Sequence, residues 1–303
     1  MLKQIKLILA LVLVCCCYSG SYAFGEPNYS TIVAFGDSLT DNGNVYKKSL
    51  ETIPNEDTWY KGRFSNSRTW AEYLCSYSSD KDCKFLDYAY GGAYSSDGYQ
   101  NVKVNDEVIY KLTTNFLQQI DNFVKKDKKY DPDKTLYVMS IGGNDIMERK
   151  KKYVDVPENV DKAIDTLIKE KNAKHIIYLN IPDISRAPMF NQADKEKKQK
   201  IHEKVVKLNK QLEKVIEKYS DQGIDIKLVD FYTFLNNLID DKSYISDKPC
   251  IDIPLSADKL NFVLEYDKTS DCKKNLTKYV FFDNLHPTGN VHKILSEEVK
   301  KDM

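Results

Sequence analysis

The chain has 303 residues, of which 42% are hydrophobic and 30% charged, with 45 basic and 45 acidic side chains. This ordinary globular composition excludes a disordered polypeptide and gives no electrostatic case for binding nucleic acid. The length suits one large domain or two small ones. Because the chain has no internal repeat, no Pro/Ser-rich linker and no change of composition, we expect a single domain over residues 24–303.

The first 23 residues have the pattern of a secretory signal peptide. Lys3 and Lys6 precede an apolar run over residues 7–17, and Ser21-Tyr22-Ala23 places small residues at the two positions that matter for cleavage. The run is too short to span a bilayer comfortably, so we expect cleavage after residue 23 and export from the cell rather than a membrane anchor.

Loss of this segment removes two lysines and no acid, which leaves a net charge of about −2. Acidic residues lie close to the basic clusters, which we interpret as solvated helix faces and loops. These clusters are Lys125-Lys126, Lys128-Lys129, Arg149–Lys152 and Lys195–Lys200. We therefore expect no nucleic-acid partner. The protein is also expected to be a monomer.

Three of the seven cysteines fall within the signal peptide, at residues 15–17. A lipid anchor on one of them is the less favoured alternative, because Val14 is a poor residue before a lipidation cysteine. The other four are an even number in an exported chain, which favours disulfides. Three pairings are possible, and we favour Cys75–Cys83 and Cys250–Cys272 because each closes a short local loop. A zinc site is disfavoured, because neither pair has C-x-x-C spacing or a histidine beside it.

Short apolar runs alternate with amphipathic stretches along the rest of the chain. Five runs rich in Ile, Val, Leu and Tyr have the character of buried parallel strands. They are Thr31–Gly36, Lys84–Ala89, Thr135–Ile141, Lys174–Ile181 and Asp225–Asp230. Strands interleaved with helices predict a three-layer α/β/α sandwich with right-handed crossovers around a five-stranded parallel sheet.

Helices are predicted between these strands, where apolar residues recur at helical spacing. They cover Thr69–Ser78, Val108–Val124, Asn159–Glu170, Asn191–Tyr219 and about Gly289 to Lys300. Two long regions, Asp41–Arg68 and Asp240–Lys278, do not fit the alternation. Long loops in compact domains tend to be functional, so both are candidates to border a substrate cleft.

A serine follows the first predicted strand. The run Phe35-Gly36-Asp37-Ser38-Leu39 leads from the apolar segment into a polar loop rich in Asn and Gly. Open α/β sheets bind their ligands at this end of the strands. Ser38 is therefore a candidate nucleophile, although a serine hydroxyl is weak without an adjacent base.

The candidate base is His286, near the C-terminus. Asp283 stands three residues before it, just ahead of a predicted helix, so both side chains can face the same way. His286 would accept the Ser38 proton, and Asp283 would fix the tautomer of the imidazole and stabilise its charged form. A lone D-x-x-H is more often a surface turn, but only this histidine combines a loop setting with a nearby acid. The other histidines are His175, His202 and His292.

Two glycine-bearing turns follow the second and third predicted strands. They contain Gly91-Gly92 and Gly142-Gly143-Asn144. In a parallel sheet both turns lie at the same end as Ser38, where glycine lets a backbone N–H approach a ligand and Asn offers a side-chain donor. Ester cleavage needs such donors where charge develops on the carbonyl oxygen. Each turn alone is more often structural, but their conjunction with D-x-x-H argues against coincidence.

Together these motifs resemble the GDSL lipase/esterase family of the SGNH hydrolase superfamily. The first and last matching segments are highly specific, and the match covers nearly all of residues 24–303. The segments are FGDSLTDNGN at 35–44, GRFSNSRTWAEYL at 62–74, AYGGA at 89–93, SIGGNDI at 140–146, NIPDISRAP at 180–188 and FFDNLHPT at 281–288. The resemblance implies a flavodoxin-like sheet, in agreement with the alternation of elements.

By this resemblance Ser38 is the nucleophile, and Asp283 and His286 complete a catalytic triad. The Ser38 amide, Gly92 and Asn144 are implied to form the oxyanion hole, with no cofactor and no metal. Many members of the family have Asn where this chain has Asp87. That position supports the glycine turn, so we expect altered local hydrogen bonding but retained activity.

The resemblance also implies a substrate class. Exported bacterial members with the same first and last motifs are similar to secreted lysophospholipases, phospholipases A and glycerophospholipid–cholesterol acyltransferases. We therefore expect a secreted serine ester hydrolase that acts on lipid acyl esters, lysophospholipid ahead of diacyl lipid. A transient contact with a membrane surface and acyl transfer to cholesterol are further expectations. A carbohydrate acetyl esterase and a non-catalytic secreted binding protein on the same fold are the alternatives.

Overall fold

The computed structural model describes residues 28–104, 107–126, 128–148, 153–254 and 259–303. The expected signal peptide, residues 1–23, lies outside the described residues. Within the described part of the chain, none of the helices has the length and apolar character needed to cross a membrane.

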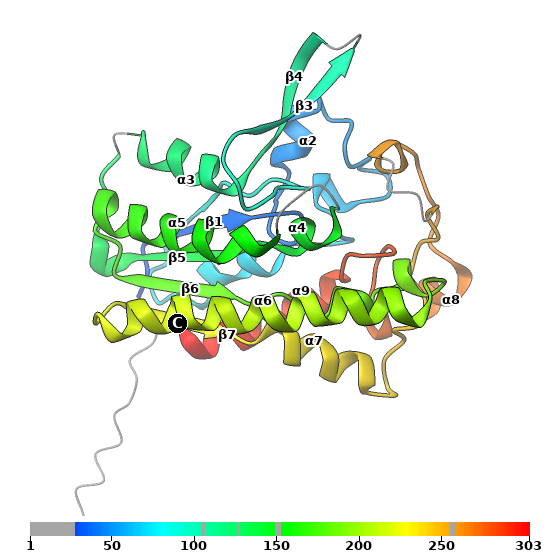
Figure 1. Ribbon diagram of the computed structural model, residues 1–303. Coiled ribbons are helices and arrows are strands. Elements are labelled where there is room, and N and C mark those ends of the chain that lie inside the picture. The colour runs from blue at the N-terminus through cyan, green and yellow to red at the C-terminus, as the bar shows by residue number, and fades with distance from the viewer. Residues whose placement is uncertain (1–27, 105–106, 127, 149–152, 255–258) are drawn as a thin grey trace, which may run out of the picture.

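The centre of the structure is a five-stranded parallel sheet with strand order β2-β1-β5-β6-β7 (Figure 1). Its strands are β1 (Thr31–Gly36), β2 (Lys84–Asp87), β5 (Thr135–Ser140), β6 (His175–Leu179) and β7 (Asp225–Val229). Every residue of β1 and β5 is buried, as expected for strands covered on both faces. All five predicted strands are confirmed, with ends that differ by at most two residues.

Helices cover both faces of the sheet, which confirms the predicted three-layer sandwich. On one face α3 (Phe116–Val124), α5 (Val156–Lys171) and α6 (Lys195–Asp221) pack side by side (Figure 1). On the other face the 3₁₀ helix η2 (Trp70–Tyr77) packs against α9 (Gly289–Val299). The shorter helices are α2 (Asn44–Lys48), α4 (Gly143–Met147), α7 (Phe231–Asp240) and α8 (Ser270–Asn275). Short 3₁₀ helices span Tyr60–Gly62, Pro132–Lys134, Tyr153–Asp155, Ile184–Arg186, Pro188–Phe190, Lys259–Phe262, Leu276–Lys278 and Lys300–Asp302.

The strand β1 is the switch point of the sheet, because successive strands are added first on one side of it and then on the other. The chain passes from β1 to β2 on one side, and later adds β5, β6 and β7 on the other side. Open α/β sheets bind ligands at such a switch point, outside the carboxyl ends of the strands. The turns that follow β1, β2 and β5 are therefore neighbours.

The helix predicted over Val108–Val124 is wrong in its first half. Glu107–Thr114 forms strand β4, which pairs antiparallel with β3 (Tyr99–Val104) in a hairpin that projects beside α2 (Figure 1). The segment is rich in β-branched residues, and such residues favour strands when a partner strand is present. Only α3, from Phe116 to Val124, is helical.

Helix α7 was not among the predicted helices, although its start has a sequence signal. The side chain of Asp230 accepts a hydrogen bond from the Thr233 amide at 3.1 Å, as an N-cap residue does. Because α7 follows β7 directly, its first turn lies at the carboxyl edge of the sheet. The helix contributes Phe231 and Leu235 to the site described below.

The two long regions pack against each other instead of extending as separate loops. The Asn55 amide donates to the carbonyl of Phe262 at 2.8 Å, and the Tyr266 amide donates to Thr58 Oγ1 at 2.7 Å. A second apolar core lies between the regions. It consists of Trp59, Cys250, Ile251, Ile253, Cys272, Tyr279 and Phe282.

Two disulfides join the cysteine pairs favoured from the sequence. Cys75–Cys83 has a Cα–Cα distance of 5.5 Å and Cys250–Cys272 one of 5.1 Å. Both cysteines of the second bridge are fully buried in the second core. The bridge closes a loop within this region, and the amides of Cys250 and Ile251, which donate to the carbonyls of Phe281 and Phe282, join it to the segment before His286.

Candidate active site

Ser38 lies two residues beyond the end of β1, where the backbone turns sharply. Gly36 has a φ of 153°, and a Cβ at this position would lie 2.5 Å from the carbonyl oxygen of Ser140 on β5. Only glycine allows the chain to turn this close to the neighbouring strand. The turn brings Ser38 to the rim of the sheet, where its side chain is half-buried.

A buried glutamine that sequence reasoning missed holds this turn. Gln119 of α3 accepts a hydrogen bond from the Gly36 amide at 2.9 Å and donates one to the Gly36 carbonyl at 2.8 Å. The Gly36 carbonyl also accepts a hydrogen bond from the Tyr90 amide at 3.2 Å, so the backbone polar groups at the end of the strand are satisfied. The available signal was a polar residue on the apolar face of a helix, because Gln119 stands between Phe116 and Phe123.

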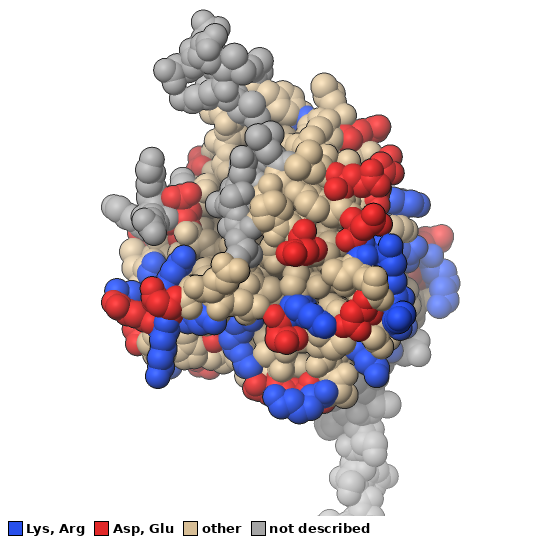
Figure 2. Space-filling model, turned by 90° about the vertical axis from the view of Figure 1, so that its right-hand side faces the viewer, with Lys and Arg blue, Asp and Glu red and all other residues tan. Residues whose placement is uncertain are grey.

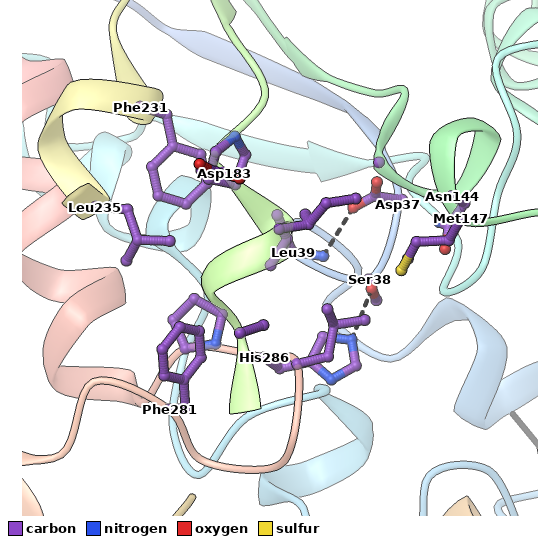
Figure 3. A pocket seen from close by; sticks show the side chains of 16 residues that line it. Asp37, Ser38, Leu39, Asn144, Met147, Asp183, Phe231, Leu235, Phe281 and His286 are labelled. Atoms are coloured by element: carbon purple, nitrogen blue, oxygen red, sulfur yellow. Dashed lines mark hydrogen bonds between the residues drawn. The ribbon is translucent and has the colours of Figure 1, made fainter. Parts of the chain in front are cut away.

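Ser38, His286 and Asp283 form a continuous hydrogen-bonded chain. The Ser38 Oγ to His286 Nε2 distance is 2.9 Å, and Figure 3 shows the serine and the imidazole facing each other. His286 Nδ1 lies 2.9 Å from Asp283 Oδ1 and 2.8 Å from Asp283 Oδ2. Asp283 and His286 are 0% and 3% exposed, so the serine is the most exposed of the three, and Ser38 and His286 both line the pocket described below.

The D-x-x-H segment is a tight turn stabilised by its own carboxylate. Asp283 Oδ1 accepts hydrogen bonds from the amides of Leu285, at 2.9 Å, and His286, at 2.8 Å. The Phe282 amide donates to the His286 carbonyl at 2.8 Å and closes the turn. Asp side chains commonly bond backbone amides two or three residues ahead in this way, and here the result aligns the acid with the histidine.

The pKa of Asp283 is lower than its ordinary value. Burial alone would raise this pKa, but the charge of His286 and the hydrogen bonds from the side chain and amide of His286 and from the amide of Leu285 outweigh burial. Asp283 is thus an ionised acceptor at neutral pH. That is the state in which a carboxylate orients the N–H of an imidazole.

Two aromatic rings from the long regions lie against the imidazole of His286. The ring of Phe64 is 5.3 Å away and that of Phe262 is 6.0 Å away. Both long regions therefore pack against His286, but none of their described residues lines the pocket beside Ser38, and their role at a substrate cleft stays a prediction. These rings restrict the movement of the histidine and keep water from its buried side.

The segment GRFSN supports the loop that carries His286. The hydroxyl of Ser65 donates to the carbonyl of Pro287 at 2.8 Å, and Asn66 Oδ1 accepts a hydrogen bond from the Gly289 amide at 2.9 Å. A Cβ at Gly289 would collide with Ser67. The close fit of these segments explains why a motif far from the triad in sequence belongs to the site.

The turns that follow β2 and β5 are joined by the side chain of Asn144. Its Nδ2 donates to the carbonyl of Ala93 at 3.0 Å. Asn144 lines the same pocket as Ser38, whereas Gly92 is not one of the described residues that line it. Gly92 has a φ of 75° and directly precedes Ala93, so its backbone conformation favours glycine.

Two acidic residues hold the glycine turn after β2. Fully buried Asp41 accepts a hydrogen bond from the Gly91 amide at 2.8 Å. Asp87, the residue that departs from the family pattern, accepts from the amides of Asn42 at 2.6 Å and Ala89 at 2.8 Å, one on each oxygen. Burial raises the pKa of Asp41 to about 6, and burial together with the charge of Asp41 raises the pKa of Asp87 well above its ordinary value.

Asp37, immediately before the serine, also has a raised pKa. Its carboxylate accepts a hydrogen bond from the Leu39 amide at 3.0 Å and lies at the pocket wall. Burial raises the pKa to about 6, despite this hydrogen bond and the charge of His286. The Asp37 carboxyl therefore binds its proton more tightly in the folded protein than in the unfolded chain.

An apolar pocket opens beside the serine (Figure 3). At one end it is lined by Asp37, Ser38, Asn144 and His286, and the rest of its wall is mainly apolar. Its apolar side chains are Leu39, Met147, Pro182, Ile184, Ala187, Phe231, Leu235, Phe281, Leu285 and Pro287. Such a wall fits a hydrocarbon chain better than a sugar, because apolar surface buries apolar groups favourably.

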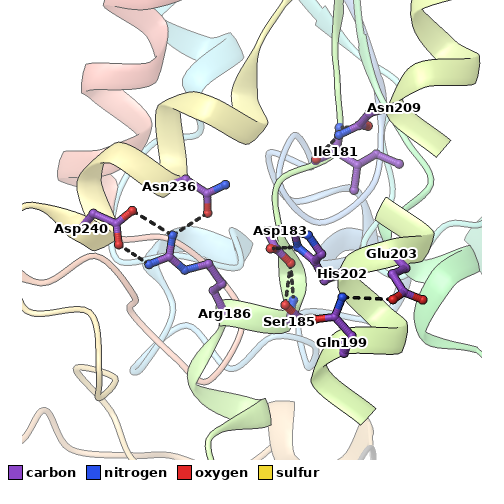
Figure 4. Close-up of polar contacts among 10 residues, drawn as sticks. All are labelled: Ile181, Asp183, Ser185, Arg186, Gln199, His202, Glu203, Asn209, Asn236 and Asp240. Carbon is purple, nitrogen blue, oxygen red and sulfur yellow. Dashed lines mark hydrogen bonds and ion pairs between the residues drawn. The ribbon is translucent and has the colours of Figure 1, made fainter. Parts of the chain in front are cut away.

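Polar contacts hold the pocket wall formed by residues 181–187 between α6 and α7 (Figure 4). Asp183 accepts hydrogen bonds from the Ser185 hydroxyl, at 2.6 Å, and lies 2.7 Å from His202 Nδ1 on α6. Arg186 pairs with Asp240 and donates to Asn236 Oδ1 at 2.9 Å, both on α7. The wall is thereby anchored on two helices.

The other histidines have structural partners instead of a nucleophile. His175 pairs with Asp225, and His292 accepts the Trp70 amide at 3.3 Å, while burial lowers the pKa of His292 to about 3. In the part of the chain that the structure describes, no group of three His, Cys, Asp or Glu side chains is placed to hold a metal ion.

Positive and negative side chains are mixed on the face of the molecule that lies at the carboxyl ends of the sheet strands. Figure 2 shows Lys and Arg interspersed with Asp and Glu around uncharged surface. Ion pairs of the described residues include Lys248 with Asp271. Of the basic clusters, Lys125 pairs with Asp121 and Lys200 with Glu196, whereas residues 149–152 lie outside the described part of the chain.

Comparison with known proteins places these features in a family. The model of the GDSL-like lipase/acylhydrolase family matches residues 32–299. The thermolabile hemolysin of Vibrio parahaemolyticus is 28% identical over 288 residues, which are 93% of this chain and 66% of the hemolysin. The phosphatidylcholine-sterol acyltransferase of Aeromonas hydrophila is 29% identical over 170 residues, 55% of this chain and 48% of the acyltransferase. The chain thus spans about half to two thirds of these relatives.

A solved structure has the same fold. The crystal structure of a GDSL-like lipase from Parabacteroides merdae aligns with a TM-score of 0.52 and 12% identity, over 91% of this chain and 96% of the other. At this identity the likeness concerns the fold alone. Motifs, fold and family match agree: the chain belongs to the GDSL-like lipase/acylhydrolase family of ester-cleaving enzymes.

Proposed function

We propose that this protein is a secreted serine carboxylester hydrolase in which Ser38 is the nucleophile, His286 the general base and Asp283 the residue that orients the base. The observation that carries the proposal is the chain from Ser38 Oγ to His286 Nε2, at 2.9 Å, and from His286 Nδ1 to Asp283. A serine hydroxyl becomes an effective nucleophile when such a base removes its proton. This series of hydrogen bonds ends at Ser38, beside an apolar pocket in which an acyl group can lie.

In the first step His286 Nε2 takes the proton of Ser38 Oγ while that oxygen attacks the ester carbonyl carbon. The negative charge that forms on the carbonyl oxygen is stabilised by the amides of Ser38 and Gly92 and by Asn144 Nδ2. The tetrahedral intermediate then collapses, the bond to the alcohol oxygen breaks, and His286 gives its proton to the leaving alcohol. The acyl group is now esterified to Ser38.

In the second step a water molecule replaces the alcohol. His286 takes a proton from the water as its oxygen attacks the acyl carbon, and the same donors stabilise the second oxyanion. Collapse of this intermediate breaks the bond to Ser38 Oγ, returns the proton to the serine and releases a carboxylic acid. A sterol hydroxyl in place of water gives a sterol ester by the same steps.

The proposed substrate is a lipid acyl ester, with lysophospholipid ahead of diacyl phospholipid. The apolar lining, which includes Phe231, Leu235 and Phe281, supports a long acyl chain. The name of the phosphatidylcholine-sterol acyltransferase supports both a phospholipid donor and a sterol acceptor. We propose cholesterol as an acceptor in a side reaction.

The proposed setting is outside the cell, after cleavage of the signal peptide behind Ala23. Two disulfides, Cys75–Cys83 and Cys250–Cys272, suit an oxidising compartment. We propose a monomer over residues 24–303 that contacts a membrane surface transiently, with no nucleic-acid partner, no cofactor and no metal.

The test is a substrate panel with product analysis by mass spectrometry. Purified enzyme and Ser38→Ala are compared on lysophospholipid, diacyl phospholipid and acetylated sugar, each with and without cholesterol, and circular dichroism verifies that the variant is folded. We expect fatty acid release, fastest from lysophospholipid, and none from Ser38→Ala. Release of acetate alone would identify a carbohydrate acetyl esterase. A chain that turns over no ester and resists a serine-reactive fluorophosphonate would be a binding protein.

A further inference from the structure

The side chain of Trp59 bonds directly to the proposed triad acid. Its indole Nε1 donates to Asp283 Oδ2 at 3.1 Å, across 224 residues of sequence. Both residues are 0% exposed, so water does not compete for the carboxylate. Apart from His286, no other side chain in the described residues has a hydrogen bond to Asp283.

The indole N–H completes the coordination of the carboxylate. Backbone amides of Leu285 and His286 bond to Oδ1, whereas the donors to Oδ2 are His286 Nδ1 and Trp59 Nε1. Rotation of the carboxylate about its terminal torsion is soft in the absence of fixed partners. Donors on both oxygens hold its plane, and hence the direction in which it accepts the N–H of His286.

Trp59 is itself fixed by the second apolar core. Its ring lies 5.2 Å from the ring of Phe262 and 6.0 Å from that of Tyr266. Its backbone amide donates to the Asn55 carbonyl at 2.9 Å. The indole is also packed in the cluster that contains the Cys250–Cys272 bridge. The position of the N–H is therefore set by packing and not by the triad alone.

We propose that Trp59 is a positioning residue of this enzyme, which acts on catalysis through the orientation of Asp283 and without touching the substrate. The inference rests on the proposed roles of Ser38, His286 and Asp283. Trp59 does not line the described pocket beside Ser38. Removal of its N–H should thus lower kcat and leave KM unchanged.

The chain supplies a matched control, because its only other tryptophan is also buried. Trp70 is 1% exposed, and its Nε1 has no hydrogen-bond partner among the residues that the structure describes. Trp59→Phe and Trp70→Phe each shrink one buried ring, but only the first removes a hydrogen bond to a carboxylate. Hydrogen bonds to charged groups contribute enough that we expect kcat of Trp59→Phe to fall roughly 10- to 100-fold. Trp70→Phe should keep kcat within about 2-fold of wild type.

A double-mutant cycle separates positioning from a general structural effect. Asp283→Ala should lower kcat by roughly 10⁴-fold, and Trp59→Phe added to it should lower kcat no further, because its target is gone. An equal loss from Trp59→Phe in both backgrounds would overturn the inference. If Asp283→Ala retains wild-type kcat, the proposed triad fails and the role of Trp59 fails with it.

A second variant covers the case in which Trp59→Phe does not fold. Benzothienylalanine at position 59 keeps the two-ring shape and replaces the N–H by sulfur. The same fall in kcat at unchanged KM is expected, with Trp70→benzothienylalanine as the control. Wild-type kcat in the benzothienylalanine-59 enzyme would contradict the proposal.

Discussion

The amide of Gly91 donates a 2.8 Å hydrogen bond to the buried carboxylate of Asp41, which joins the glycine turn after β2 to the loop after Ser38. The same carboxylate accepts amides of its own loop, at Gly43 and Val45. The loop that follows Ser38 and the turn that contains Gly92 are therefore held by one network. Asp87 belongs to it as well, since it accepts the amide of Asn42.

The Asp41 and Asp87 pair predicts a pH-dependent stability. The pKa of each carboxyl is raised by burial, to about 6 for Asp41 and well above the ordinary value for Asp87. The folded protein therefore keeps these protons in a range where the unfolded chain has lost them. Their contribution to the free energy of unfolding falls as the pH rises from about 4 through the folded-state pKa values.

Asp87→Asn tests this dependence. Both Asp87 oxygens accept amide protons, and an Asn amide group would face one of these donors, so we expect the variant to be about 1–2 kcal/mol less stable than wild type at pH 5. The difference in stability between wild type and variant should narrow or reverse by pH 8. Wild type loses the stabilisation that comes from the Asp87 proton as the pH rises, whereas the variant has no such proton. Urea unfolding at both pH values measures it. A difference that stays constant with pH would show that Asp87 does not titrate in this range.

Asn144→Ala tests the proposed oxyanion hole. Loss of one such donor lowers kcat by about 10²- to 10³-fold in a serine hydrolase, and we expect this fall with little change in KM. Asn290→Ala is a suitable control, because the Asn290 amide also donates to a backbone carbonyl, that of Thr277 at 2.9 Å, but does not line the pocket. Steady-state kinetics on a nitrophenyl ester provide the comparison. Equal kcat values for the two variants would remove Asn144 from the mechanism.

Leu235→Trp tests whether the pocket holds the acyl chain. Leu235 lines the pocket from α7, and a larger side chain there should exclude long chains. We expect kcat/KM to fall at least about 10-fold for a laurate ester and to change little for a butyrate ester, given the free energy of burying each methylene. Phe234→Trp, on the same helix but outside the pocket lining, should affect neither ester. A parallel loss on both esters in Leu235→Trp would place the acyl chain elsewhere.

The sequence was informative where chemistry depends on local motifs. Ser38 follows a buried apolar strand, and the spacing of Asp283 and His286 is that of a turn closed by its own carboxylate, so the structure brings them together as predicted. The five strands could also be predicted from local sequence, since each is a short apolar run.

Long-range contacts explain what the sequence could not show. Gln119 bonds to Gly36 and Trp59 bonds to Asp283, across 83 and 224 residues respectively, and neither pair has a spacing that a local pattern records. The error at 108–124 has a similar origin. Its apolar residues fit helical spacing, but pairing with β3 decided the structure of Glu107–Thr114.

Whether Ser38, activated by His286, forms the covalent acyl intermediate can be measured directly. The purified enzyme is labelled with a fluorophosphonate, and the adduct is mapped by peptide mass spectrometry. We expect one adduct, on the peptide that contains Ser38, absent in Ser38→Ala and formed far more slowly in His286→Ala. An adduct on a different serine, or no adduct on an enzyme that still hydrolyses esters, would contradict this role of Ser38.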